Sequence, residues 1–197
     1  GADGATHAGT FDLSYLRCIP NLLIMAPADE NECRQMLTTG YQYDGPSAVR
    51  YPRGTGPGVS IDKSLKSIAI GQAQTIRQGE KVAILAFGSM VTPAIEAGNE
   101  LNATVINMRF IKPLDNALIA KISETHDLIV TIEENTRMGG AGSGIAEYLL
   151  SKGNTTPIKI LGLPDSFLDH GEHQAMLDAS GLCSDGIIDT VRQHFPA

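Results

Sequence analysis

The sequence predicts an α/β fold in which a mostly parallel sheet is covered by helices on both faces. From residue 81 onward, short apolar segments typical of buried strands alternate with segments of about ten residues that have helical periodicity. This alternation favours parallel strands joined by right-handed crossovers. The composition, 42% hydrophobic and 19% charged over 197 residues, is that of a globular chain with a packed core and one or two domains.

The first 58 residues contain a glycine-rich loop, GADGATHAG, followed by two short α/β units. Asp29 is expected to cap a helix, with Glu32 at the capping-box position. Pro20 and Pro27 mark the ends of the preceding helix and strand. The elements expected here are a helix over Phe11–Ile19, a strand over Leu22–Ala28, a helix over Glu30–Thr39 and a strand over Ser47–Tyr51.

Residues 54–67 are rich in Gly, Pro, Ser and Lys, which predicts a linker. The segments Ile68–Arg77 and Lys81–Gly88, separated by Gln-Gly-Glu, are expected to form a hairpin. The elements expected after it are helices over Met90–Leu101, Asn116–His126 and Ile145–Lys152, strands over Ala103–Phe110, Asp127–Glu134 and Ile158–Pro164, and two final helices over Glu172–Ala179 and Asp185–His194.

Charge and cysteine content narrow the classes of function. The net charge of −7 and a pI near 5.1 argue against a nucleic-acid or anionic-membrane surface, because both require clustered Lys and Arg. The three cysteines are far apart and form no zinc pattern, which fits a reducing, cytoplasmic setting. No apolar run is long enough to cross a bilayer. The chain starts at Gly1 rather than Met, so we expect that a preceding segment of a longer protein is missing.

The opening loop is the first candidate site, because it places Asp3, Thr6 and His7 among three glycines with little to bury. Glycines let the backbone approach a ligand closely, and histidine exchanges protons near neutral pH. One interpretation is therefore a proton-transfer loop at the start of a helix. On composition alone, a tight turn in which Asp caps the following segment is the more common alternative.

Arg50 and Arg53 form the second candidate site, at the exit of the strand over Ser47–Tyr51. Ligands of open α/β folds lie beyond the carboxyl ends of the strands, where an arginine can grip a phosphate or carboxylate with two hydrogen bonds. The alternative interpretation of Arg53 is a surface arginine paired with a neighbouring acid.

Three further motifs have weaker implications. The segment RMGGAGSG lacks the spacing of a nucleotide-binding loop and predicts close packing of a helix instead. His170 and His173 are three residues apart without a third metal donor, so exposed loop histidines are expected. Glu133 and Glu134 end a strand, where they either cap a neighbouring helix or line an interface; the sequence leaves this open.

Several segments together closely resemble the 1-deoxy-D-xylulose-5-phosphate synthases, a family of the transketolase superfamily. They are GADGATHAG, LRCIPNLLIMAPADENECRQML, SAVRYPRG, MRFIKPLD, EENTRMGGAGSG and LGLPD. The resemblance covers the whole chain. It implies that residues 1–58 are the back part of a pyrimidine-binding domain, that 59–66 are a linker, and that 67–197 are a transketolase C-terminal domain.

The resemblance also implies the reaction and the roles of particular residues. Pyruvate would be decarboxylated, and its remaining two carbons joined to D-glyceraldehyde 3-phosphate to give 1-deoxy-D-xylulose 5-phosphate, a precursor of isoprenoids, thiamine and pyridoxal. His7 and Asp3 match the family's catalytic pair near the acceptor aldehyde, and Arg53 matches the arginine that binds the substrate phosphate. Thr6 and Arg50 are possible supporting residues. An imidazole suits protonation of a developing alkoxide, and a guanidinium suits a phosphate dianion.

The cofactors implied are thiamine diphosphate and Mg²⁺, both bound mainly by residues absent from this chain. A cytoplasmic homodimer completed by the missing N-terminal segment is expected, and the fragment alone is expected to be inactive. Two alternatives stay open: the β-type subunit of a 2-oxo acid dehydrogenase, which would need no phosphate-binding arginine, and a non-catalytic module for dimerisation and ligand sensing.

Overall fold

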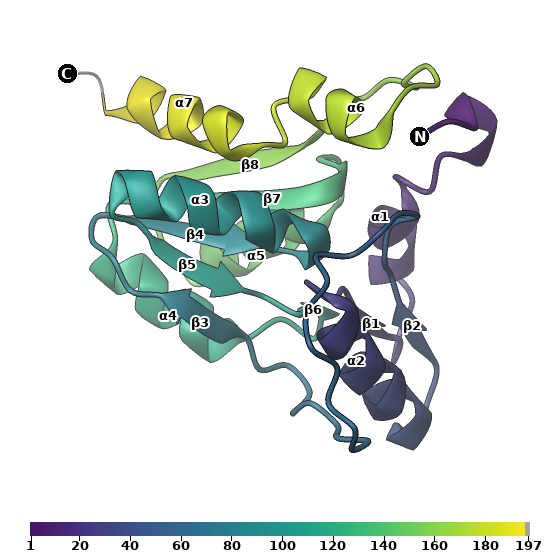
Figure 1. The fold of residues 1–197 in the computed structure, drawn as a ribbon. Helices are drawn as coiled ribbons and strands as arrows, with labels where there is room; N and C mark the ends of the chain where they lie inside the picture. The colour runs from purple at the N-terminus through teal and green to yellow at the C-terminus, as the bar shows by residue number, and fades with distance from the viewer. Residues whose placement is uncertain (196–197) are drawn as a thin grey trace.

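The computed structural model describes residues 1–195, and its larger sheet is the predicted, mostly parallel one (Figure 1). Its strand order is β3-β5-β4-β7-β8, and only the edge strand β3 runs antiparallel to its neighbour. The central strands β4 and β5 are fully buried, which explains the continuous apolar sequence of β4 and the apolar middle of β5. The strands are β3 (Gln74–Arg77), β4 (Val82–Ala86), β5 (Thr104–Asn107), β7 (Leu128–Thr136) and β8 (Ile158–Leu163).

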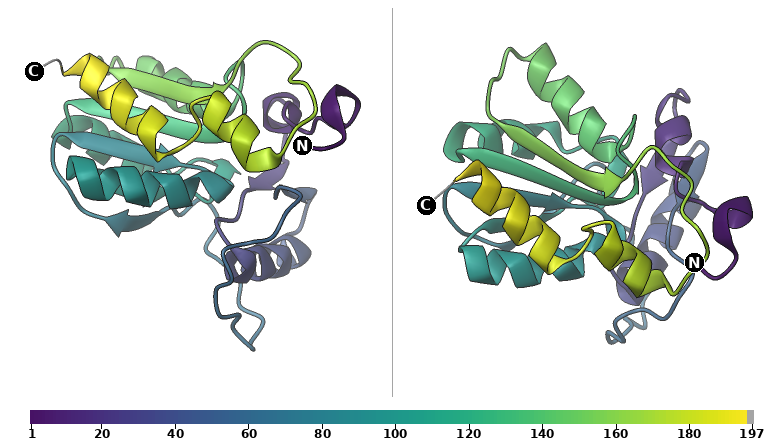
Figure 2. Two further views of the ribbon diagram at one scale, coloured as in Figure 1. Left: turned by 45° about the horizontal axis from the view of Figure 1, so that its top comes forward. Right: turned by 90° about the horizontal axis from the view of Figure 1, so that it is seen from above.

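Helices cover both faces of this sheet, as predicted (Figures 1 and 2). One apolar cluster packs α3 (Val91–Leu101), α6 (His173–Ala179) and α7 (Ser184–His194) on one face. A second cluster packs α4 (Asn116–Thr125) and α5 (Ala141–Ser151) on the other. The sheet is therefore the middle layer of three.

A second sheet of three strands carries the N-terminal part of the chain. Its order is β2-β1-β6, with β1 (Leu23–Met25) and β2 (Ser47–Val49) parallel to each other. The third strand, β6 (Phe110–Lys112), comes from the later part of the chain and pairs with β1 in antiparallel orientation. The flanking helices are α1 (Asp12–Arg17) and α2 (Glu30–Gln42).

Two strand predictions are wrong in detail. The strand expected over Ala103–Phe110 is split into β5 and β6, because Arg109 has a positive φ of 60° that turns the chain from one sheet to the other. The expected hairpin does not form, because β3 pairs with β5 and not with β4. The connection after β3 is bonded to the start of β5, where Glu80 N donates to the Asn102 carbonyl at 2.8 Å.

Residues 54–67 are irregular, as expected of a linker, but they are fastened along α2. Gly58 N donates to Glu30 Oε1 and Asp62 N donates to Asn31 Oδ1, each at 2.8 Å. The segment therefore packs against the surface of α2. No helix within residues 1–195 combines the length and apolar character that crossing a bilayer requires.

The predicted caps are partly confirmed. Asp29 caps α2 by accepting a hydrogen bond from Glu32 N at 2.8 Å. The Glu32 carboxylate, however, accepts from Ala28 N at 2.7 Å, so the reciprocal bond of a capping box to Asp29 N is replaced. Helix α5 begins at Ala141, inside the glycine-rich stretch, and not at Ile145.

Candidate active site

The opening loop forms a single 3₁₀ turn, Gly4–His7, entered through Gly4 with a φ of 69°. Asp3, Thr6 and His7 are all exposed on this turn. Thr6 Oγ1 and His7 Nδ1 lie 3.0 Å apart, and this bond orients the imidazole. The turn interpretation is therefore right about the turn and wrong about the cap, because the Asp3 side chain makes no capping hydrogen bond. The contact with Thr6 uses Nδ1 of His7, which leaves Nε2 for further contacts.

Arg53 lies directly against this turn, because its Nη1 atom is ion-paired with Asp3 Oδ2. The Arg53 side chain is 83% exposed and that of Asp3 is 52% exposed. The structure therefore brings together two of the three principal candidates from positions fifty residues apart. It also matches the alternative interpretation of Arg53 as an arginine paired with an acid, and that acid is itself a candidate site residue.

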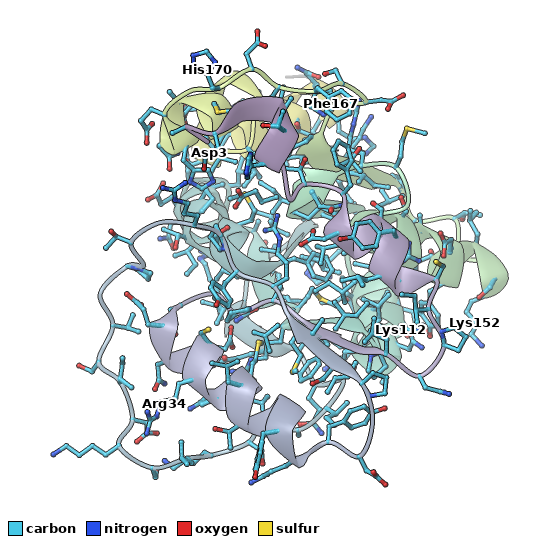
Figure 3. The ribbon with its side chains drawn as sticks, turned by 90° about the vertical axis from the view of Figure 1, so that its right-hand side faces the viewer. Asp3, Arg34, Lys112, Lys152, Phe167 and His170 are labelled. Atoms are coloured by element: carbon cyan, nitrogen blue, oxygen red, sulfur yellow. The ribbon has the colours of Figure 1, made fainter. Side chains whose placement is uncertain are left out.

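The opening turn is held in place by the segment that precedes α6. Gly171 N donates to the Gly1 carbonyl at 3.2 Å, and the rings of Phe11 and Phe167 meet edge to face with centroids 5.7 Å apart. Asp3 accordingly lies beside the segment that carries Phe167 and His170 (Figure 3). The position of the turn thus depends on the later part of the chain.

Arg53 lines a groove of about 1730 Å³ that runs between α2 and the helices α6 and α7. The described residues that line it include Tyr51, Ser89 and His173 but neither Asp3 nor His7. Arg53 therefore lines the groove and also contacts the opening turn, which lies outside the groove lining. A small phosphorylated molecule in the groove could reach its guanidinium.

Arg50 is half-buried and already engaged. Its Nη2 atom donates to the Glu134 carbonyl at 2.5 Å, and its Nε atom donates to Asp12 Oδ2 at 3.4 Å. Glu134 is nearly buried and also receives hydrogen bonds from Ser89 and His173. Arg50 is thus a support of the segment that carries Arg53, not a free cation beside it.

Glu133 answers one of the open questions, because it caps a neighbouring helix. Its carboxylate accepts hydrogen bonds from Ala141 N at 2.7 Å and Gly142 N at 2.8 Å, at the start of α5. Burial raises the pKa of Glu133 to about 7, although the two backbone bonds and the cationic Arg17 and Arg50 act in the opposite direction.

The glycines of RMGGAGSG have the packing role predicted for them. A Cβ atom on Gly140 would lie 2.5 Å from Glu133 Oε2, and one on Gly142 would collide with Thr131 Oγ1. Only glycine lets α5 begin so close to the sheet. The motif therefore forms a packed helix start.

The prediction of exposed loop histidines is confirmed for His170 and wrong for His173. His170 is exposed, whereas His173 is the first residue of α6, and its Nε2 atom lies 2.6 Å from Glu134 Oε1. Ser89 and His173 were missed as site residues, because no sequence spacing links them to Glu134. Within residues 1–195, no three His, Cys, Asp or Glu side chains converge as a metal site.

Comparison with known proteins gives matches over nearly the whole chain. Residues 71–187 match the family model described as transketolase, C-terminal domain, and residues 1–58 match transketolase, pyrimidine binding domain. The 1-deoxy-D-xylulose-5-phosphate synthase of Nitrosomonas europaea is 58% identical over 195 residues, which are 99% of this chain and 32% of that protein. The enzyme of the same name from Thioalkalivibrio sulfidiphilus is 56% identical over 98% of this chain and 30% of its own length.

Solved structures show the same architecture. A split-gene transketolase, described as an inactive β4 tetramer, has a TM-score of 0.85 at 29% identity over 96% of this chain and 62% of its own. The transketolase of Campylobacter jejuni has a TM-score of 0.74 at 21% identity over 98% of this chain and 29% of its own, a likeness of fold alone. The chain spans about a third of the length of the curated relatives it matches.

Proposed function

Because this chain belongs to the transketolase family, we propose that it is the acceptor-binding part of a longer enzyme that makes 1-deoxy-D-xylulose 5-phosphate. That enzyme would decarboxylate pyruvate and join the two remaining carbons to D-glyceraldehyde 3-phosphate. The observation that carries the proposal is the ion pair between Arg53 and Asp3, because it links the groove to the turn that bears His7.

Arg53 is proposed to bind the phosphate of the acceptor. A guanidinium is always charged, and its planar fork matches phosphate oxygens. It projects from the exit of β2, beyond the carboxyl end of a parallel strand, where ligands of α/β folds bind. Its exposed pair with Asp3 is of the weak kind that a dianion can displace.

His7 is proposed to move a proton at the other end of the acceptor. When a new bond forms at the aldehyde carbon, the carbonyl oxygen becomes an alkoxide and must be protonated. The contact with Thr6 fixes one ring nitrogen of His7, so the other can serve that oxygen. Asp3 would hold Arg53 beside the turn until phosphate takes its place.

Thiamine diphosphate is the proposed cofactor, in agreement with the match to a pyrimidine-binding domain. When bound, it supplies the electron sink for decarboxylation. Among the described residues, no three His, Cys, Asp or Glu side chains converge as metal ligands. Following the resemblance, we place the diphosphate and Mg²⁺ mainly on polypeptide outside this chain. A homodimer and a cytoplasmic location are further proposals, based on the resemblance.

The test is the choice of acceptor by the complete enzyme. With pyruvate and thiamine diphosphate, we expect 1-deoxy-D-xylulose 5-phosphate to form from D-glyceraldehyde 3-phosphate, and much slower condensation with unphosphorylated D-glyceraldehyde. Reductive acylation of lipoamide without condensation would instead identify a 2-oxo acid dehydrogenase. Absence of both reactions would favour a module for assembly or ligand sensing.

A second test addresses the division of the cofactor site. Titration calorimetry of these 197 residues with thiamine diphosphate and Mg²⁺ should give no micromolar binding, whereas the complete enzyme should bind. Micromolar binding by the chain alone would contradict our assignment of the diphosphate site to other polypeptide.

A further inference from the structure

A cluster of four polar side chains joins four separate elements beside the groove. Glu134, near the end of β7, lies at its centre. The Glu134 carboxylate accepts from Ser89 Oγ at 3.0 Å, its Oε1 atom lies 2.6 Å from His173 Nε2, and its Oε2 atom lies 3.9 Å from Arg50 Nη1. The cluster thus ties the β2 exit, the end of β7, the 3₁₀ turn Gly88–Met90 before α3 and the start of α6 to one carboxylate.

The burial of this cluster makes its geometry restrictive. The side chains of Glu134 and Arg50 are 9% and 14% exposed, so neither can exchange a lost partner freely for water. His173 is the most accessible member at 37%, and it lines the groove together with Ser89. A substitution of His173 therefore removes one contact without opening the core.

The cluster controls where the segment after β2 leaves the sheet. Arg50 N donates to the Met25 carbonyl at 2.8 Å, and the Arg50 guanidinium is held by both the carbonyl and the carboxylate of Glu134. Three residues later the chain presents Arg53, whose side chain is exposed and paired with Asp3 alone among the described residues. The position of Arg53 thus depends on how firmly Arg50 is held.

We propose that His173 is a positioning residue for acceptor binding: it holds the Glu134 carboxylate, which fixes Arg50 and with it the segment that presents Arg53. The inference rests on the proposed function, because it takes Arg53 to be the ligand of the acceptor phosphate. His173 itself need not touch the substrate. Its effect is to keep the guanidinium where the phosphate arrives.

The experiment compares His173→Ala, His173→Gln and His194→Ala in the complete enzyme. Loss of a hydrogen bond to a charged group should raise the KM for D-glyceraldehyde 3-phosphate about tenfold in His173→Ala. The KM for pyruvate and kcat should stay within about twofold of the wild type. His173→Gln keeps an N–H that can reach Glu134 and should restore most of the affinity. His194→Ala removes an imidazole from the end of α7, outside the groove lining, and should behave as the wild type.

Hydrogen–deuterium exchange supplies a readout that does not require turnover. Residues 50–57 should exchange faster in His173→Ala than in the wild type and return toward normal in His173→Gln. Unchanged exchange and unchanged KM in His173→Ala would overturn the proposal. Equal changes in both KM values and in kcat, or failure of His173→Gln to rescue, would also overturn it, because they indicate general loss of structure.

The two proposals fail in different ways. If the wild-type enzyme makes no 1-deoxy-D-xylulose 5-phosphate, the proposed function is wrong, and the exchange measurement still decides whether His173 holds the segment. If the wild type makes the product and His173→Ala keeps its KM for the acceptor, only the positioning role is wrong.

Discussion

The Arg53 side chain is exposed, and so is its one described ion pair, with Asp3. Exposed ion pairs contribute only about 0–1 kcal/mol to stability, so the guanidinium is available to a ligand. If it binds the acceptor phosphate, Arg53→Ala should raise the KM for D-glyceraldehyde 3-phosphate about tenfold or more. The KM for pyruvate and turnover of unphosphorylated D-glyceraldehyde should change little. Steady-state kinetics with both acceptors provide the measurement. Arg192→Ala, which removes another arginine of an exposed pair, is the control. Equal losses for pyruvate and acceptor would contradict the phosphate role.

If His7 protonates the acceptor oxygen, its substitution has a different expected signature, because a proton is transferred only in the transition state. His7→Ala should lower kcat by about a hundredfold or more while leaving the KM for the acceptor nearly unchanged. Thr6→Val, which removes the partner of Nδ1 but keeps the imidazole, should have a smaller effect. Single-turnover assays would follow the condensation step. A His7→Ala enzyme with normal kcat would leave this residue as part of a turn only.

At the scale of single residues, the sequence identifies residues whose partners are close along the chain. It does not identify residues whose partners are distant along the chain. Asp29 was identified as a cap because its partner is three residues away. His173 was expected to be a free loop residue, since its partner Glu134 lies 39 positions away and only the fold brings them together. The supporting role of Arg50 in the site stays a prediction, and its engagement with the Glu134 carbonyl, 84 positions away, cannot be read from spacing.

At the scale of single elements, the start of α5 makes the stability of the fold depend on pH. Glu133 is fully buried, and its pKa is raised from 4.5 to about 7. Because the folded state holds this proton more tightly, the stabilising effect is complete below pH 4.5 and is lost as pH rises through 7. The loss is on the order of 3 kcal/mol, because a tenfold change in a proton-binding constant corresponds to about 1.4 kcal/mol. Above that pH, the two hydrogen bonds donated by backbone N–H groups of α5 partly stabilise the ionised Glu133 carboxylate.

Glu133→Gln tests this dependence, because an amide has no proton to lose. Melting temperatures of both proteins should be compared between about pH 5 and pH 8. The wild type should lose stability relative to the variant as pH rises. Hydrogen exchange at Ala141 and Gly142 would show whether the change is located at the start of α5. A wild-type-to-variant difference that is constant over this range would contradict the raised pKa.

The strands show what hydrophobic pattern can and cannot predict. It located the parallel strands β4, β7 and β8, because β4 is apolar throughout, β7 begins with an apolar run and β8 is rich in Ile and Leu. It did not predict that β3 pairs with β5, because hydrophobic periodicity contains no information about which strands pair. The break at Arg109 also escaped detection, since the positive φ falls on a residue without the usual glycine signal.

At the scale of the whole molecule, the two sheets are joined by β6 and by two buried carboxylates, Glu134, described above, and Glu32. Glu32 is 5% exposed, and its oxygens accept from Arg109 Nε at 2.7 Å and from Asn107 Nδ2 at 3.0 Å. Glu32 belongs to α2, whereas the two donors lie at the end of β5 and in the turn to β6. The contact between the two parts of the chain is therefore specific and charged, and not only apolar.

Breaking this contact should destabilise the molecule strongly. Glu32→Ala leaves a half-buried guanidinium without its carboxylate, which costs on the order of 3–5 kcal/mol. The Glu32→Ala, Arg109→Ala double variant should cost less than the sum of the single variants, because the second change removes the unpaired charge. Chemical unfolding of the four proteins measures the coupling. Glu100→Ala, in the exposed pair with Arg192, should cost less than about 1 kcal/mol. Additive losses from Glu32 and Arg109 would show that this ion pair does not contribute to holding the two sheets together.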